Sequence, residues 1–284
     1  RANNVFKITA HRLYLNTNNN FNKEGKHMRD ILVIVDAQND FLTLSLANEH
    51  ADRVIRAICN TLTDHHYDRV FLTRDTHDEN YLQTKEGHDL PVVHCVKDTI
   101  GWQINGEILE ALHANYNPND TVFMDKNTFG SQLLFKAVQL EAAVYGEENL
   151  RITFVGVCTG ICVISNILLA KTAAPNANIR VIENACACVT DRSHETALNA
   201  MKTGYIDVVS IEKPENEILD EVSMALLAYA SDNIDVIKEN GELFVSYCSD
   251  NNSFPFSNIK YNADGLDYEY LEKGLDKLHV GHCW

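Results

Sequence analysis

The run ILVIVD at residues 31–36 decides the fold, because it places a short aliphatic strand directly before a carboxylate. Similar runs follow it along the chain, and amphipathic helical patterns separate them. The expected strands are 31–35, 70–73, 121–124, 152–155, 179–182 and 206–209, and the expected helices are 51–62, 131–140, 161–171 and 194–202. This alternation predicts a three-layer α/β/α domain with a six-stranded, mostly parallel sheet.

The chain is longer than this domain requires. We expect an Asn-rich N-terminal extension over residues 1–28, the α/β domain over 29–213 and a C-terminal extension over 214–284. The C-terminal extension starts with a helical pattern at 215–230 and continues in short strand-like pieces. We expect it to form a separate small module or the arm of a homo-oligomer.

Composition excludes several classes of protein. A net charge of −16 argues against a nucleic-acid surface, because phosphate binding needs clustered Lys and Arg. No apolar run approaches the roughly 20 residues of a membrane span, and the first residues lack the pattern of a signal peptide. Several of the eight cysteines lie in apolar strand or helix patterns, as in reduced intracellular proteins. We therefore expect a cytoplasmic protein with a small-molecule partner and neither a nucleic-acid nor a membrane partner.

Chemically active side chains follow three of the expected strands. Asp36 follows the first strand, Lys126 the third and Cys162 the fourth. Ligands of open α/β sheets bind outside the carboxyl ends of the strands, so these side chains are expected to converge. Each residue alone has a simpler explanation as a turn, cap or core residue. Together they supply a base, an ammonium group and a nucleophile.

Cys162 stands where the expected helix 161–171 begins. The free amides at that helix end, together with Lys126, are expected to lower the pKa of the thiol and favour its thiolate. Cys158 lies nearer the strand and fits a buried core residue better.

A second group of residues has metal-ligand character. Asp75 and His77 lie two residues apart just beyond the second strand, so extended backbone would point both side chains to one side. A loop then returns His94, while His88 in that loop is expected to be solvated. One carboxylate and two imidazoles suit a divalent metal, with zinc first and iron or manganese as alternatives.

Five separated motifs are similar to one family. The chain resembles the isochorismatase-like cysteine hydrolases, nicotinamidase type, in motifs that occur in the family's order over roughly residues 30–210. The motifs are IVDAQNDF at 34–41, TRDTH at 73–77, VHCVKDT at 93–99, DKNTF at 125–129 and GVCTGICV at 156–163. The resemblance implies the isochorismatase-like hydrolase fold for the six-stranded domain.

The resemblance also implies roles for single residues. Asp36, Lys126 and Cys162 would form the catalytic triad, and the backbone amides of Cys158 and Cys162 would form the oxyanion hole. The peptide bond between Val157 and Cys158 would be cis.

The same resemblance makes Asp75, His77 and His94 the metal ligands, a set that isochorismatases proper typically lack. Two departures from the family pattern are Gly160, where an Asp is frequent, and the aliphatic stretch 90–93, where nicotinamidases usually carry an aromatic residue.

These residues predict a metal-dependent cysteine amidohydrolase that releases ammonia from a small amide, with a nicotinamide-like substrate first. Phe41 is expected to be either a wall for the substrate ring or an ordinary core residue. Two alternatives stay open. One is a metal-independent hydrolase of a ureido acid or an isochorismate-like ether, and the other is a catalytically silent binding protein.

Overall fold

The computed structural model describes residues 27–210 and, beyond them, the backbone of five short strands. The chain divides into two compact units, and the unit Tyr14–Ile211 contains the α/β sheet. The domain boundaries at 29–213 stay a prediction.

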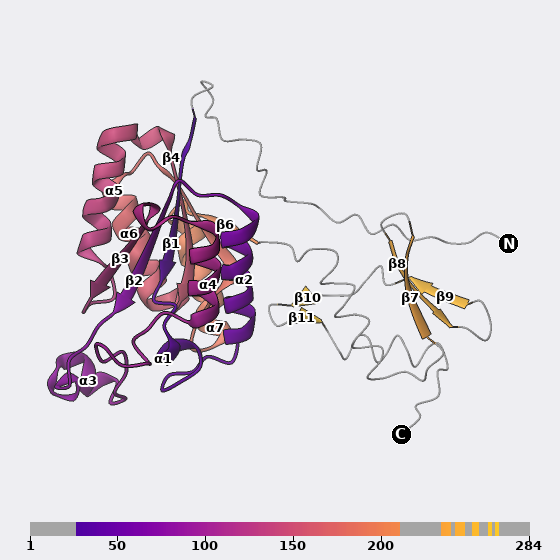
Figure 1. Cartoon of the computed structure of the whole chain (residues 1–284), viewed down its shortest axis with the longest axis horizontal. Helices are drawn as coiled ribbons and strands as arrows, with labels where there is room; N and C mark the ends of the chain where they lie inside the picture. The colour runs from indigo at the N-terminus through magenta and orange to yellow at the C-terminus, as the bar shows by residue number, and fades with distance from the viewer. Residues whose placement is uncertain are drawn as a thin grey trace. The chain divides into compact units, whose positions relative to one another are not determined.

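The α/β unit is built on a six-stranded sheet (Figure 1). Its strands are β1 (Arg29–Val35), β2 (Arg69–Asp75), β3 (Thr121–Lys126), β4 (Leu150–Val157), β5 (Asn178–Ala187) and β6 (Asp207–Val209). They lie in the order β3-β2-β1-β4-β5-β6, and each neighbouring pair is parallel. The predicted six-stranded α/β fold is therefore confirmed, and its sheet is wholly parallel.

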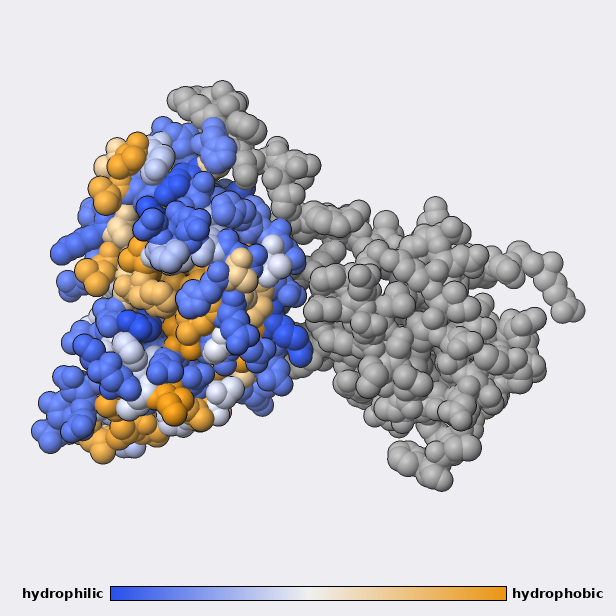
Figure 2. All heavy atoms as spheres, viewed as in Figure 1, coloured by the Kyte–Doolittle hydropathy of each residue, from blue (hydrophilic) through white to orange (hydrophobic). Residues whose placement is uncertain are grey.

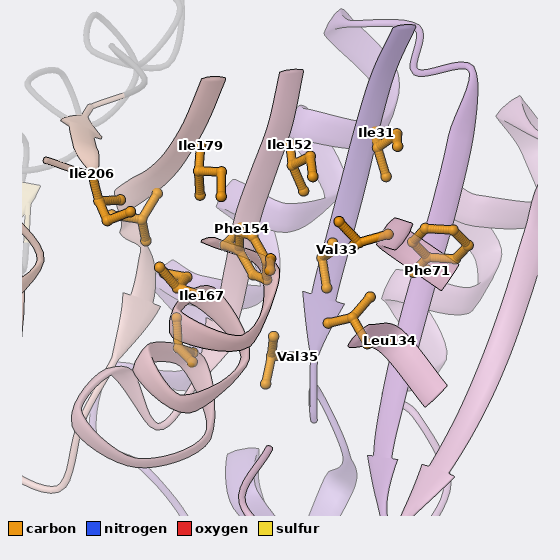
Figure 3. Close-up of a cluster of buried hydrophobic side chains, with 14 of the residues drawn as sticks. Ile31, Val33, Val35, Phe71, Leu134, Ile152, Phe154, Ile167, Ile179 and Ile206 are labelled. Atoms are coloured by element: carbon orange, nitrogen blue, oxygen red, sulfur yellow. The ribbon is translucent and has the colours of Figure 1, made fainter. Parts of the chain in front are cut away.

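Helices cover both faces of this sheet. The α-helices are α1 (Asn39–Leu42), α2 (Ala51–Asp64), α3 (Lys85–Asp89), α4 (Gly106–Asn115), α5 (Gln132–Tyr145), α6 (Ile164–Ala173) and α7 (Asp191–Thr203). One buried core packs α5, α6 and α7 against the sheet, and Figure 3 shows part of it, including Phe154, Ile167 and Leu134. The second core packs α2 and α4 against the opposite face through Val54, Ile108 and their neighbours. Two cores with the sheet between them make the three layers.

Two helical segments differ from the sequence prediction. Helix α4 was not predicted, because its sequence GEILEALHAN buries only two residues, Ile108 and Leu112. The expected helix 161–171 is divided into a π-helical turn, Thr159–Val163, and α6. Cys162 therefore lies in an irregular turn that precedes the regular helix.

The order of the strands places the candidate site residues at the middle of the sheet. β1 pairs with β2 on one side and with β4 on the other, so the direction of winding changes between β1 and β4. At Gly156 the backbone has φ +118°, and a Cβ there would lie 2.1 Å from the carbonyl oxygen of Val35. Glycine thus allows β4 to approach β1 closely beside the switch point.

Beyond the α/β unit the structure describes strands β7 (Ile234–Glu239), β8 (Glu242–Tyr247) and β9 (Asn252–Pro255), which form an antiparallel sheet. Strands β10 (Tyr261–Asn262) and β11 (Gly265–Leu266) form an antiparallel pair. The helix expected at 215–230 lies outside the described residues.

The visible face of the α/β unit is mainly hydrophilic, with smaller hydrophobic patches (Figure 2). Across the described part of the chain, we find no helix with the length and apolar character needed to cross a membrane.

Candidate functional site

Three polar side chains meet at the carboxyl ends of the central strands. Asp36 directly follows β1, Lys126 ends β3, and Cys162 lies in the turn that follows β4. All three are buried, with exposed fractions of 0%, 7% and 6%, respectively. The parallel topology thus brings these predicted residues together from three separated segments.

Lys126 is in contact with the other two side chains. Its Nζ lies 2.6 Å from Oδ2 of Asp36 and 3.7 Å from Sγ of Cys162. The hydroxyl of Thr73 donates a hydrogen bond to Oδ1 of Asp36 over 2.7 Å, and the charge of Asp36 acts on the nearby Cys162 thiol. The carboxylate is therefore held between a cation, a hydroxyl and a thiol.

Burial shapes the protonation of this group. It raises the pKa of Asp36, although the charge of Lys126 opposes the shift. Burial alone lowers the pKa of Lys126, but the charge of Asp36 outweighs it, so the pKa stands above its usual value. Lys126 is therefore cationic at neutral pH, and Asp36 is a stronger base than an exposed carboxylate.

The expected thiolate at Cys162 is not the resting form. Burial raises the pKa of Cys162 well above its usual value, and the neighbouring charge of Asp36 raises it further against the opposing effect of Lys126. Desolvation and the carboxylate of Asp36 therefore outweigh the helix terminus and Lys126, on which the expected thiolate rested. Cys162 thus rests as a thiol beside a base.

The predicted metal residues also meet. Asp75, His77 and His94 are buried, and together with Glu86 they offer ligand atoms that all lie within 4.8 Å of one another. Nε2 of His77 lies 2.9 Å from Oδ2 of Asp75, and Nε2 of His94 lies 3.6 Å from the same oxygen. Two carboxylates and two imidazoles form a donor set that suits a divalent transition metal.

Backbone contacts orient these donors. Nδ1 of His94 is hydrogen-bonded to the carbonyl oxygen of Val92 over 2.8 Å, which leaves Nε2 facing Asp75. The side chain of Gln38 donates to the carbonyl of Asp75 and accepts from its amide. Hydrogen bonds from His77 and His94 lower the pKa of Asp75 against the effect of burial, which alone would raise it. The Asp75 carboxylate is therefore ionised.

Four residues that the sequence argument did not single out support this arrangement: Gln38, Thr73, Glu86 and Asn166. Glu86 lies between the two predicted histidine ligands His77 and His94, in the segment that also contains His88. His88 is exposed and is not part of the cluster. Glu86 lies in the same short helix α3 as His88, and its Oε1 lies 4.0 Å from Nε2 of His77.

Asn166 connects two parts of the candidate site from within α6. Its Nδ2 donates to the carbonyl oxygens of Cys162 and Phe129, and its Oδ1 accepts from the amide of Ser131. A fully buried amide therefore ties the Cys162 turn to the segment that follows Lys126.

Aromatic rings surround the imidazoles. The ring of Phe41 lies 5.3 Å from that of His94, centroid to centroid, and is only partly buried. Tyr81 is fully buried and packs against both His77 and His94. Phe41 is thus placed beside the histidine cluster, where a substrate wall was expected, while its role stays a prediction.

The peptide bond between Val157 and Cys158 is cis, as the resemblance implied. It lies at the end of β4, so the Cys158 amide and the Cys162 turn are in the same short segment.

Comparison with known proteins identifies the family of the α/β unit. A family model described as the isochorismatase domain matches residues 30–213. The chain belongs to the isochorismatase family. It is an isochorismatase-like hydrolase by family, and a comparison with curated proteins gave no match.

Several solved structures share the fold. The nicotinamidase PncA of Bacillus subtilis is 21% identical with a TM-score of 0.53, and the match covers 64% of this chain and 100% of that one. The pyrazinamidase of Pyrococcus horikoshii, solved in complex with zinc, is 21% identical with a TM-score of 0.50, covering 64% and 99%. The yeast nicotinamidase Pnc1p is 19% identical with a TM-score of 0.53, covering 64% and 100%. At this identity the likeness shows the fold of the isochorismatase-like domain.

Proposed function

We propose that this chain is a metal-dependent cysteine amidohydrolase that releases ammonia from a small amide, with nicotinamide as the first candidate substrate. The observation that carries the proposal is the position of Lys126. Its Nζ contacts Asp36 and Cys162 on one side and lies 3.4 Å from Oδ1 of Asp75 on the other. The candidate nucleophile and the candidate metal ligands therefore belong to one connected group.

In the proposed reaction, Asp36 accepts the proton of the Cys162 thiol as Sγ attacks the amide carbonyl carbon. The carbon–nitrogen bond then breaks, and Asp36 returns the proton to the departing ammonia. Water next attacks the thioester carbon while Asp36 accepts its proton, and the carboxylic acid leaves as the thiol is restored. Lys126 stabilises the charged forms of Asp36 and Cys162 throughout.

The developing oxyanion needs hydrogen-bond donors. We assign this role to the backbone amides of Cys158 and Cys162, which lie in the segment that follows β4. Such a donor typically contributes about 3–4 kcal/mol to stabilising the transition state.

Asp75, His77, Glu86 and His94 would hold the metal. Their two imidazoles and two carboxylates suit zinc first, with iron or manganese as alternatives. When bound, the metal would supply a Lewis acid able to orient a substrate ring nitrogen or a water. Glu86 is more exposed than the other three donors, so we expect water or substrate to replace it most readily as a metal ligand.

Side chains near the histidine cluster favour a compact substrate. The half-buried Phe41 ring offers one aromatic face beside His94. Leu90 and Val93 are exposed by 39% and 45%, and they provide aliphatic surface in the loop that leads to His94. An aromatic amide would therefore stack on one side only, which favours weaker binding or tolerance of other small amides.

An ammonia-release assay tests the proposal. Nicotinamide, pyrazinamide, small aliphatic amides and a ureido acid would be compared on one sample whose metal content is measured. We expect saturable release from the aromatic amides, loss of activity on chelation and recovery on adding zinc. Equal turnover of metal-free and metal-loaded samples would favour the metal-independent hydrolase. No release from any compound by a metal-replete sample would favour the silent binding protein.

Phe41→Ala, compared with Leu44→Ala, tests the substrate wall. Leu44 is exposed by 48%, so its truncation should leave KM unchanged, whereas loss of the Phe41 ring should raise KM for aromatic amides. A homo-oligomeric state and a cytoplasmic location stay predictions from the sequence.

A further inference from the structure

Cys158 and Cys188, whose side chains have no part in the proposed reaction, follow neighbouring strands at the carboxyl edge of the sheet. β4 and β5 are parallel, and their register pairs Val157 with Ala187. Cys158 and Cys188 are the next residues on the two chains. Neighbouring strands lie about 4.8 Å apart, and a disulfide spans Cα separations of roughly 4.4–6.8 Å. A cross-link between the two positions is therefore compatible with the spacing of the strands that lead to them.

The two sulfur atoms interact. Each of the two thiols shifts the pKa of the other, and both cysteines are free. A Cβ added to Gly160 would lie 3.4 Å from Sγ of Cys188, so the missing side chain at this position lets the Cys162 turn approach that sulfur. The turn that carries Cys158 and Cys162 therefore packs closely against Cys188.

Cys188 is held in an environment that favours a thiolate. Cys158, Ser193 and the backbone at Gly160 and Val189 all lower the pKa of its thiol. Thr190 caps the 13-residue helix α7, so the first turn of that helix stands close to Cys188. The interaction with Cys158 lowers the pKa of Cys188 to about 5, against the effect of burial.

Burial disfavours the thiolate at the other cysteines of the α/β unit. Burial raises the pKa of Cys186 to about 12 and also raises the pKa of Cys59, Cys95 and Cys162. A thiolate reacts with peroxide far faster than a thiol does. Cys188 is therefore the described cysteine best suited to react first.

We propose that Cys158 and Cys188 form an oxidant-reactive dithiol that hydrogen peroxide converts to an intramolecular disulfide. The Cys188 thiolate attacks one peroxide oxygen, the O–O bond breaks, and hydroxide leaves and is protonated by solvent to water. The Cys158 sulfur then attacks the resulting sulfenic acid, the S–O bond breaks, and the thiol proton leaves with that hydroxide as water. Both sulfurs are oxidised, and the peroxide is reduced to two waters.

The burial of the two cysteines limits which oxidants can reach them. Cys188 is exposed by only 3% and Cys158 is half-buried, so a small peroxide can reach the pair more readily than a bulky disulfide reagent. The bond would join the segment between β4 and the Cys162 turn to the end of β5. This proposal does not depend on the substrate or on the amidase activity.

Mapping of the cross-link in the full chain tests the proposal. The reduced protein would be treated with hydrogen peroxide, alkylated, digested with trypsin and analysed by mass spectrometry. Trypsin leaves Cys158 and Cys162 together in residues 152–171, and Cys186 and Cys188 together in residues 181–192. We expect these two peptides to be joined, with the loss of two hydrogens, and to separate on reduction.

Single substitutions assign the sulfurs. Cys186→Ser is the matched control, because it removes a buried thiol two residues earlier, near the end of β5, and it should leave the cross-link intact. Cys188→Ser should abolish it. In Cys158→Ser the sulfenic acid at Cys188 has no partner, so it should accumulate and be trapped by dimedone.

Three results would overturn the proposal. They are a peroxide product at Cys162 ahead of Cys188, a link between Cys158 and Cys162, and persistence of the inter-peptide link in Cys188→Ser. If Cys188→Ser is unfolded by circular dichroism, dimedone trapping in Cys158→Ser decides the matter, and an unlabelled Cys188 there contradicts it.

Discussion

The Nζ of Lys126 lies 3.4 Å from Oδ1 of Asp75. The other oxygen of the same carboxylate, Oδ2, faces the imidazoles of His77 and His94. One carboxylate thus connects the candidate catalytic group with the candidate metal cluster, and its loss should affect both.

Substitution of the metal residues should separate these two effects. Asp75→Ala, His77→Ala and His94→Ala are each expected to weaken metal affinity by at least about tenfold, since even partners of metal ligands contribute that much. Excess metal should restore turnover in His94→Ala further than in Asp75→Ala, because only Asp75 contacts Lys126. Elemental analysis and turnover at increasing zinc concentration measure both quantities. Unchanged stoichiometric metal in all three variants would refute the cluster.

Asn166→Ala should lower kcat while leaving metal content unchanged. Its amide binds the carbonyl of Cys162 and the amide of Ser131, so its loss frees the nucleophile turn and exposes unpaired buried groups at a cost of about 1–3 kcal/mol. Ser165→Ala is the control, because Ser165 is the neighbouring residue and bonds only the carbonyl of Ile161 among the contacts described. A folded Asn166→Ala enzyme with normal kcat and KM would contradict this positioning role.

Asp30 should contribute to stability at neutral pH. It is buried at the amino end of the sheet between His65 and Arg151, and removing one partner of such a group typically costs about 3–5 kcal/mol. We expect Asp30→Ala to lower the free energy of unfolding by this amount in urea titrations, whereas Asp89→Ala, in the exposed pair with Lys85, should change little.

The pH dependence of this effect has a definite sign. Burial alone raises the pKa of Asp30, but hydrogen bonds from His65 and Arg151 outweigh it, so the folded-state pKa is lowered. The stabilisation is therefore fully present above the unfolded-state pKa of about 3.9 and is lost as the pH falls through the lower, folded-state pKa. The difference between wild type and Asp30→Ala should shrink below about pH 4. A difference that stays constant from pH 7 down to acid unfolding would be inconsistent with this assignment.

Much of the fold could be predicted because strand and helix signals agree with tertiary packing. The six strands read as aliphatic runs since both faces of a parallel sheet are buried. Helix α4 was not predicted, because its small buried face gives little periodic hydrophobic pattern in the sequence. The π-helical turn around Cys162 was not predicted, because a π-helix and an α-helix differ in hydrogen-bond register and not in a distinct sequence pattern.

Some residues of the candidate site could be predicted from the sequence, and others could not. Asp36, Lys126 and Cys162 could be placed because each stands at a strand end or the turn that follows one. Glu86 and Asn166 could not, since their positions depend on loop and helix geometry rather than on spacing. The prediction that Cys162 rests as a thiolate was wrong, because local sequence does not reveal that the thiol is buried beside Asp36.

Removal of residues after Ala230 should leave the α/β unit folded. The sheet and the helices that cover both its faces are complete by residue 210 in the described structure. Far-UV circular dichroism and a single cooperative unfolding transition measure this. An insoluble or unfolded product would place the C-terminal segment within the core and correct the boundary near residue 213.

The most direct test of the catalytic assignment compares Cys162→Ala with Cys158→Ser at equal metal content. Only the Cys162 side chain is proposed to form the thioester, whereas Cys158 is proposed to contribute its backbone amide. Ammonia release from nicotinamide should vanish in Cys162→Ala and persist in Cys158→Ser, with both variants folded. Turnover at the wild-type rate by Cys162→Ala would contradict the account.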